Sequence, residues 1–227
     1  MRTDELFPRT RNELGGGAVH IPDWLDLDAQ VELVGRCREW SRGPAGLRTP
    51  RMPDGTPLSI RSVCLGWHWY PYAYSRTCDD HDGAPVKPLP PDIVALAADA
   101  AVEAGYHRGD LRFDASIVNI YDARSKLGLH QDSAEGAGTI AAGHPVVTIS
   151  LGDTCIFRFG NNDTRTRPWT DVELRSGDLF VFGGPSRLAY HGVVRTIANT
   201  APPELALDGT RISITVRDSG HEPGHAG

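Results

Sequence analysis

The stretch Arg211-Ile-Ser-Ile-Thr-Val-Arg217 alternates polar and apolar side chains at every position. Successive side chains on a β-strand point to opposite faces, so Ser213 and Thr215 share one face with the two arginines, and the apolar residues share the other. An apolar face of this kind packs against a core. An enclosed polar face with a guanidinium at each end suits a small dicarboxylate, because arginine binds carboxylates through two hydrogen bonds and cannot lose its proton.

A second pattern lies upstream of this strand, where His130 and Asp132 stand two residues apart and His191 follows later. Two imidazoles and one carboxylate can occupy one face of a metal ion and leave the opposite positions open, which is the ligand set of non-haem Fe(II) oxygenases. An isolated His-x-Asp is weak evidence in a chain with nine histidines. A single buried histidine is more often a satisfied core residue, and two arginines on a strand are more often solvated. Together, however, these residues predict a metal site next to a site for an anion.

The composition is that of one compact domain of 227 residues with a net charge of −6, which argues against a generally basic nucleic-acid binder. Residues 41–78 nevertheless carry five arginines against one aspartate, a local excess of 5 − 1 = 4 positive charges that can steer a polyanion. The cysteines show no C-x-x-C spacing, which is typical of reduced thiols in a cytosolic protein. No apolar run reaches membrane-spanning length, so we expect a cytoplasmic protein without a membrane partner.

The pattern of elements predicts two helices followed by a series of short strands. The helices are expected from Asp26 or Asp28 to near Gly43, and from Pro91 to about Gly105. Strands are expected at residues 18–21, 115–121, 129–131, 146–151, 156–159, 178–182 and 211–217. Their spacing favours an antiparallel double-sheet barrel with the helices packed outside it, an α+β fold. Residues 1–14 are expected to be loosely ordered, and residues 218–227, with His221 and His225, to form a flexible tail.

Five aromatic residues lie between Trp67 and Tyr74, flanked by Arg61 and Arg76. One interpretation is a hairpin that packs alternate rings onto the barrel. The other is a surface that holds an unstacked nucleobase, because proteins combine planar rings with arginine for this purpose. The pattern alone does not decide between the two interpretations.

Taken together, these motifs resemble the AlkB family of Fe(II)/2-oxoglutarate-dependent dioxygenases, which remove alkyl groups from nucleobases. The similarity runs from about Gly17 to Arg217. The motifs that carry it are Asn119-Ile-Tyr121, Leu129-His-Gln-Asp132, Ser150-Leu-Gly152, Phe182-Gly-Gly-Pro-Ser-Arg-Leu-Ala-Tyr-His-Gly192, Arg211-x₅-Arg217, Leu65-Gly-Trp67 and Tyr72-Ala-Tyr-Ser75.

The resemblance implies a single dioxygenase domain over residues 1–227. Its core would be a double-stranded β-helix, a jelly-roll barrel of the cupin type, at about residues 111–217. An N-terminal nucleotide-recognition lid would span about residues 45–90. It also implies Fe(II), 2-oxoglutarate and O₂ as cofactor and cosubstrates, with formaldehyde, succinate and CO₂ as products. Its substrates would be alkylated DNA, with RNA left open, and no obligate protein partner is implied.

The resemblance also assigns roles to individual residues. The iron ligands would be His130, Asp132 and His191. The 2-oxoglutarate contacts would be Asn119, Tyr121, Arg211 and Arg217, together with Ser213 and Thr215 on the polar face of the same strand. The substrate contacts would be Trp67, Tyr72 and Tyr74, with Lys126, Glu135 and Arg187 as weaker candidates.

The chain departs from the family pattern close to the iron ligands. An acidic residue usually stands two positions after the iron aspartate, but this chain has Ala134 there, followed by Glu135. Either Glu135 takes over the contact to the base, or the pocket accepts different bases. A basic residue is also expected soon after Gly160, and both Arg165 and Arg167 fit that expectation.

Two other functions remain open from the sequence. The same oxygenase chemistry could act on a small molecule or a protein, with the aromatic residues lining a different pocket. Alternatively, the chain could be a non-enzymatic barrel that binds nucleic acid or senses a metal.

Overall fold

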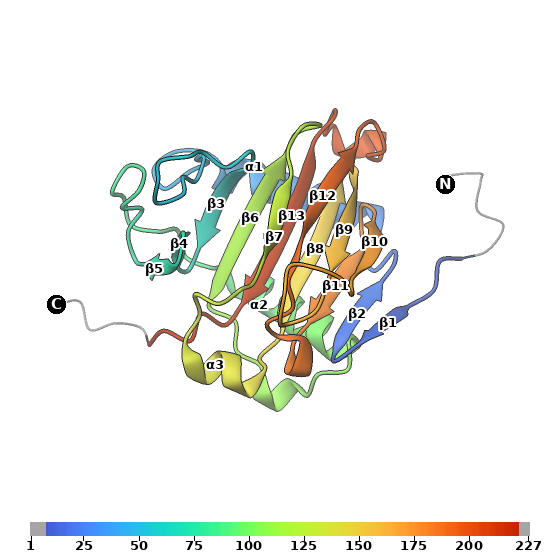
Figure 1. The fold of residues 1–227 in the computed structure, drawn as a ribbon. Helices are drawn as coiled ribbons and strands as arrows, with labels where there is room; N and C mark the ends of the chain where they lie inside the picture. Colours follow the sequence, from blue (N-terminus) through green and yellow to red (C-terminus); the bar gives the residue numbers. More distant parts are fainter. Residues whose placement is uncertain (1–7, 223–227) are drawn as a thin grey trace.

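The computed structural model describes residues 8–222. Two antiparallel sheets form its centre, and a short hairpin lies beside them (Figure 1). The large sheet contains, in spatial order, β1 (Asn12–Gly15), β2 (Ala18–Ile21), β11 (Leu179–Phe182), β8 (Val146–Gly152), β13 (Arg211–Arg217), β6 (Ala115–Tyr121) and β3 (Arg61–Leu65). The smaller sheet contains β10 (Thr170–Leu174), β9 (Thr154–Phe159), β12 (His191–Ile197) and β7 (Leu127–His130). The hairpin pairs β4 (His68–Tyr70) with β5 (Ala73–Ser75).

Three helices accompany the sheets: α1 (Leu27–Trp40), α2 (Pro91–Glu103) and α3 (Ala137–Ala142). Short 3₁₀ turns are η1 (Arg108–Asp110), η2 (Gly184–Ser186) and η3 (Pro203–Leu205). The carboxylate of Asp26 caps α1 by accepting from the backbone N–H of Ala29 at 2.9 Å, and Pro91 opens α2. Both predicted helices are present, although α1 ends at Trp40, before the expected Gly43. Both lie behind the large sheet in Figure 1.

Alternation along the strands separates two apolar cores. Ile212, Ile214 and Val216 of β13 belong to a cluster that the large sheet forms with α1 and α2. The second cluster lies between the two sheets and includes Phe157 of β9 and Phe180 of β11. One face of the large sheet is therefore covered by helices, and the other faces the smaller sheet, where the polar residues of β13 lie.

The sequence predicted β2, β6 and β13 with their observed limits, and four further strands within about two residues. It missed β1, β3, β10, β12 and α3. β10 alternates exposed Asp171 and Glu173 with buried Val172 and Leu174, but aspartate and glutamate are uncommon in strands and weaken the signal. In β12 the register shifts between Val193 and Arg195, which breaks the alternation. α3 is short and rich in alanine and glycine, so it has no apolar periodicity to detect.

Two predictions about the chain ends were wrong. Residues 12–14 were expected to be loosely ordered but belong to β1. The predicted flexible tail does not begin at residue 218, because Asp218 and Ser219 are buried and Ser219 donates to both carboxylate oxygens of Asp114, at 2.6 and 2.8 Å. The ring of His221 lies 5.3 Å from that of Trp67, and His225 lies outside the described residues. Within residues 8–222, no helix has both the length and the apolar character needed to cross a membrane.

Candidate active site

The pairing of β7 with β12 brings the three predicted metal ligands together. His130 ends β7, His191 begins β12, and the two face each other in the strand register. The Nε2 atom of His130 lies 3.8 Å from Oδ1 of Asp132, and the Nε2 atom of His191 lies 3.7 Å from Oδ2. All three ligand atoms lie within 4.8 Å of one another, so the group could hold one metal ion.

Backbone hydrogen bonds orient both imidazoles toward this group. The Nδ1–H of His130 donates to the carbonyl of Gly128 at 2.9 Å, and the Nδ1–H of His191 donates to the carbonyl of Ala189 at 2.9 Å. Because each ring carries its proton on Nδ1, each presents the lone pair of Nε2 to the site.

The electrostatics keep Asp132 and His191 in the protonation states that a metal needs. Burial, followed by the charge of His130, lowers the pKa of His191 to about 4, so this ring is neutral near pH 7. Burial would raise the pKa of Asp132, but Arg217 and the two histidines outweigh it, and the pKa falls well below its ordinary value. Oδ2 of Asp132 is buried without a hydrogen-bond partner among the described residues, which leaves it available as a ligand.

An inner cavity of about 50 Å³ lies against this group, between the two sheets. The residues predicted to bind the metal or the cosubstrate all line it: Asn119, Tyr121, His130, Asp132, His191, Arg211, Ser213, Thr215 and Arg217. Phe157 and Phe182 are among the other residues that line it. β13 therefore presents its whole polar face to one small enclosed space.

Arg211 is the most unusual residue of the inner cavity. Its side chain is 1% exposed, and its one hydrogen bond goes from Nη2 to the hydroxyl of Ser150 at 3.0 Å. Nε and Nη1 have no partner, and no carboxylate within residues 8–222 forms an ion pair with it. Burying an unpaired charge costs several kcal/mol, so this guanidinium is suited to receive an anion.

Arg217, at the other end of the row, is already paired. Its Nη1 lies 2.9 Å from Oδ1 of Asp132 and 2.8 Å from Oε1 of Glu135. The two arginines of β13 therefore differ, because Arg211 forms no ion pair within residues 8–222 and Arg217 belongs to a buried charge network.

An outer cavity of about 280 Å³ shares His130, Asp132 and Arg217 with the inner one. The hairpin supplies its aromatic lining, Trp69 and Tyr72, and Tyr72 is 72% exposed with a φ of 71°. The sequence named Tyr72 as a substrate contact but did not single out Trp69 from its aromatic neighbours.

The same outer cavity separates the two basic candidates after Gly160. Arg165 lines it. Arg167 does not, and its guanidinium carbon lies 5.5 Å from the centre of the Trp169 ring. The structure therefore places Arg165 at the cavity that opens onto the metal ligands.

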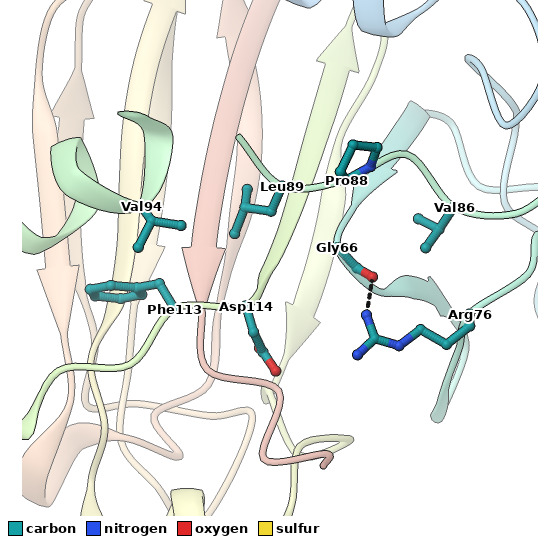
Figure 2. A pocket seen from close by; sticks show the side chains of 8 residues that line it. All are labelled: Gly66, Arg76, Val86, Pro88, Leu89, Val94, Phe113 and Asp114. Atoms are coloured by element: carbon teal, nitrogen blue, oxygen red, sulfur yellow. Dashed lines mark hydrogen bonds between the residues drawn. The ribbon is translucent and has the colours of Figure 1, made fainter. Parts of the chain in front are cut away.

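Trp67 does not line the outer cavity. Its Nε1–H donates to Asp114 at 3.0 Å, and the guanidinium carbon of Arg76 lies 3.6 Å from the centre of its ring. Figure 2 shows Arg76 and Asp114 in a separate open groove, where Arg76 donates to the carbonyl of Gly66. These contacts give Trp67 a structural role in the packing of the hairpin. Lys126, another predicted substrate contact, also lies outside the outer cavity and is exposed.

The remaining predicted contacts meet at Glu135. Its Oε1 accepts from the hydroxyl of Tyr74 at 2.7 Å and from Arg217 at 2.8 Å, and its Oε2 lies 3.3 Å from Nη2 of Arg187. The Glu135 side chain is 0% exposed. Although it lines the outer cavity, its Oε1 is occupied within the protein, and its Oε2 has no hydrogen bond to a residue in the range 8–222, an arrangement that the sequence did not indicate.

Comparison with known proteins agrees with this geometry. The 2OG-Fe(II) oxygenase superfamily matches residues 17–217. The alpha-ketoglutarate-dependent dioxygenase AlkB of Escherichia coli is 38% identical, over 74% of this chain and 75% of that protein. The DNA N(6)-methyladenine demethylase ALKBH1D of Arabidopsis thaliana is 34% identical over 88% of this chain.

The chain spans about half the length of the Arabidopsis proteins it matches, for example 49% of ALKBH1D. Among solved structures, OsALKBH1 superimposes with a TM-score of 0.82 at 34% identity, covering 92% of this chain and 99% of that one. The chain therefore belongs to the AlkB family of the 2OG-Fe(II) oxygenase superfamily.

Proposed function

We propose that this chain is an Fe(II)- and 2-oxoglutarate-dependent dioxygenase that removes alkyl groups from nucleobases in DNA. For a methyl group, the products are formaldehyde, succinate and CO₂. The observation that carries the proposal is the buried, unpaired guanidinium of Arg211 in the cavity that contains the three metal ligands. A structural barrel has no use for such a charge, whereas a 2-oxoglutarate site requires it. The relatives named for nucleic-acid dealkylation support the choice of substrate.

The donor atoms fit ferrous iron. His130, Asp132 and His191 would hold the ion with two imidazole nitrogens and one carboxylate oxygen, and the unpaired Oδ2 of Asp132 is consistent with that role. When bound, the iron supplies, together with 2-oxoglutarate and O₂, the oxidation of the C–H bond beside the alkylated nitrogen.

The remaining residues of the inner cavity bind and shield the cosubstrate. Arg211 would pair with one carboxylate of 2-oxoglutarate, and Arg217, next to Asp132, would bind the end nearer the metal. Asn119 and Tyr121 would add polar contacts. Phe157 and Phe182 exclude water from the enclosed space, which strengthens each ionic contact.

The outer cavity is the proposed site of the alkylated base. Trp69 and Tyr72 offer ring faces, and Arg165 places a positive charge at the same cavity. We infer that the segments of residues 45–90 outside β3, which belongs to the large sheet, form a lid over this cavity and that the two facing sheets form a double-stranded β-helix. N-methylated adenine and cytosine are the favoured substrates, because an alkyl group that blocks pairing lowers the cost of extruding the base.

The proposal is tested with a set of DNA and RNA oligonucleotides that each carry one methylated base, alongside their unmodified counterparts. We expect formaldehyde from at least one methylated oligonucleotide, with succinate formed in equal amount, and none from the unmodified strands. Succinate formed only with a panel of metabolites would instead identify a small-molecule hydroxylase. Tight oligonucleotide binding without succinate from any substrate would identify a non-enzymatic binder.

His130→Ala should abolish the stabilisation of the protein by a divalent metal. Mn(II) at 100 times its Kd should raise the free energy of unfolding of the wild type by about 2.7 kcal/mol. His130 is the least buried ligand, so its removal should leave the fold intact. Thermal unfolding with and without Mn(II) measures the effect, with His107→Ala, on the surface, as the control. Equal stabilisation of His130→Ala and the wild type would remove His130 from the metal site.

Arg211→Met should weaken 2-oxoglutarate binding by about 30-fold or more, because one carboxylate then loses its buried partner. Mn(II) binding should persist, since Arg211 makes no contact with the metal ligands. Calorimetry under anaerobic conditions measures both affinities, and Arg195→Met, an exposed arginine on β12, is the matched control. An unchanged cosubstrate affinity would contradict the role of Arg211.

Trp69→Ala should lower kcat/KM on a methylated oligonucleotide about 5- to 150-fold, the equivalent of a lost stacking contact of about 1–3 kcal/mol. Its affinity for 2-oxoglutarate should not change. Trp67→Ala should instead lower the free energy of unfolding, because the ring packs against Arg76 and donates to Asp114. If Trp67→Ala impaired repair without loss of stability, while Trp69→Ala did not, the assignment of the two rings would be reversed.

A further inference from the structure

Glu135 connects three segments that are distant in the sequence. Its Oε1 accepts from Tyr74 of β5 and from Arg217 at the end of β13, and its Oε2 faces Arg187, which follows η2. The Nη1 atom of Arg187 also donates to the backbone carbonyl of Asp132 at 2.8 Å. One buried carboxylate therefore holds a hairpin residue and two arginines around the proposed metal site.

The charges of this group balance. Arg187 and Arg217 contribute two positive charges, and Asp132 and Glu135 contribute two negative charges. Nη1 of Arg217 is shared between Asp132 at 2.9 Å and Glu135 at 2.8 Å. Without Glu135, both guanidinium groups would depend on Asp132, whose carboxylate must also bind the metal. Glu135 therefore keeps Arg217 in place while Asp132 serves as a ligand.

Tyr74 extends this network to the aromatic wall of the outer cavity. Burial raises the pKa of Tyr74 well above its ordinary value, so its hydroxyl keeps its proton and donates to Glu135. In the hairpin, Tyr74 stands directly opposite Trp69, and Tyr72 lies in the turn between the two strands. A bond to Tyr74 thus fixes the element that carries both rings lining the outer cavity.

We propose that Glu135 is a positioning residue that couples the position of the β4–β5 hairpin to the binding of 2-oxoglutarate. The inference rests on the proposed function, because it takes Arg217 to be a cosubstrate contact. Oε1 of Glu135 is occupied by Tyr74 and Arg217, and Oε2 is buried 3.3 Å from Nη2 of Arg187 without a hydrogen bond, so we assign Glu135 a role through these three side chains. When 2-oxoglutarate holds Arg217, it also stabilises the hairpin in the position in which Tyr74 bonds to Glu135. The hairpin in that position in turn strengthens cosubstrate binding.

The test uses Tyr74→Phe, Glu135→Gln and Glu135→Asp, with Tyr70→Phe as the matched control. Tyr70 lies in the same hairpin, and its hydroxyl makes no hydrogen bond to a residue in the range 8–222. The affinity for 2-oxoglutarate is measured by calorimetry without oxygen and with Mn(II) bound. The exchange of backbone amides in residues 68–75 is followed with and without 2-oxoglutarate, and no nucleic acid is present.

We expect Glu135→Gln to weaken 2-oxoglutarate binding about tenfold and Tyr74→Phe about threefold, since loss of one bond to the shared carboxylate only loosens the arrangement. Glu135→Asp should recover part of the loss, and Tyr70→Phe should match the wild type. In the wild type 2-oxoglutarate should slow amide exchange in the hairpin, and Tyr74→Phe and Glu135→Gln should lose this protection.

The coupling would be overturned if Tyr74→Phe kept both the wild-type affinity and the protection of the hairpin. Glu135 would then only neutralise its arginines. Should Glu135→Gln fail to fold, Tyr74→Phe still decides, because it removes one hydroxyl and leaves the ion pairs intact. A wild-type protein that did not bind 2-oxoglutarate would overturn the proposed function as well, whereas binding without protection overturns the coupling alone.

Discussion

Asp132 carries its negative charge inside the protein, and much of the site follows from the cost of keeping it there. A buried carboxylate is tolerated only when opposite charges and hydrogen bonds surround it. Arg217 at 2.9 Å supplies the nearest charge, and the two imidazoles lie on the other side, with their Nε2 atoms within 3.8 Å. The carboxylate of Asp132 must therefore be surrounded by an arginine at the end of a central strand and by one histidine from each of two paired strands. That requirement fixes how the two sheets face each other at this point.

Strand β13 meets this requirement and also builds the core. Its apolar face packs under the helices, and its polar face lines the inner cavity, so one alternating sequence serves both purposes. The pattern was readable because a central strand of a large sheet is held on both edges, by β6 and β8, over nearly its full length. A slip of one residue would turn both arginines into the apolar core. The alternation therefore placed the polar face of β13 at the inner cavity, whereas the sequence did not indicate Thr148 or the apolar residues that also line it.

The hairpin was less predictable for a physical reason. β4 and β5 have three residues each and pair only with each other, so alternation does not determine which rings face the cavity. The positive φ of Tyr72 turns the chain at their junction, a conformation that no pattern of apolar residues signals. The structure accordingly places Trp69, and not Trp67, at the outer cavity. The partners of Glu135 were hidden for a related reason, because they lie 61 and 82 residues away along the chain.

These two regions together determine how a base could be recognised. The acidic residues that line the outer cavity are Asp132 and Glu135, and both are engaged by arginines. Position 134, where the family usually has a carboxylate, is an alanine. Hydrogen bonds to charged acceptors are the contacts that discriminate most strongly between exocyclic groups. Oδ2 of Asp132, which the proposed function gives to the metal, and Oε2 of Glu135 accept no hydrogen bond within residues 8–222. Under the proposed function, base selection would therefore combine stacking on the hairpin rings, the shape of the cavity and the polar side chains that also line it, Asn119, Gln131, Ser133 and Arg165.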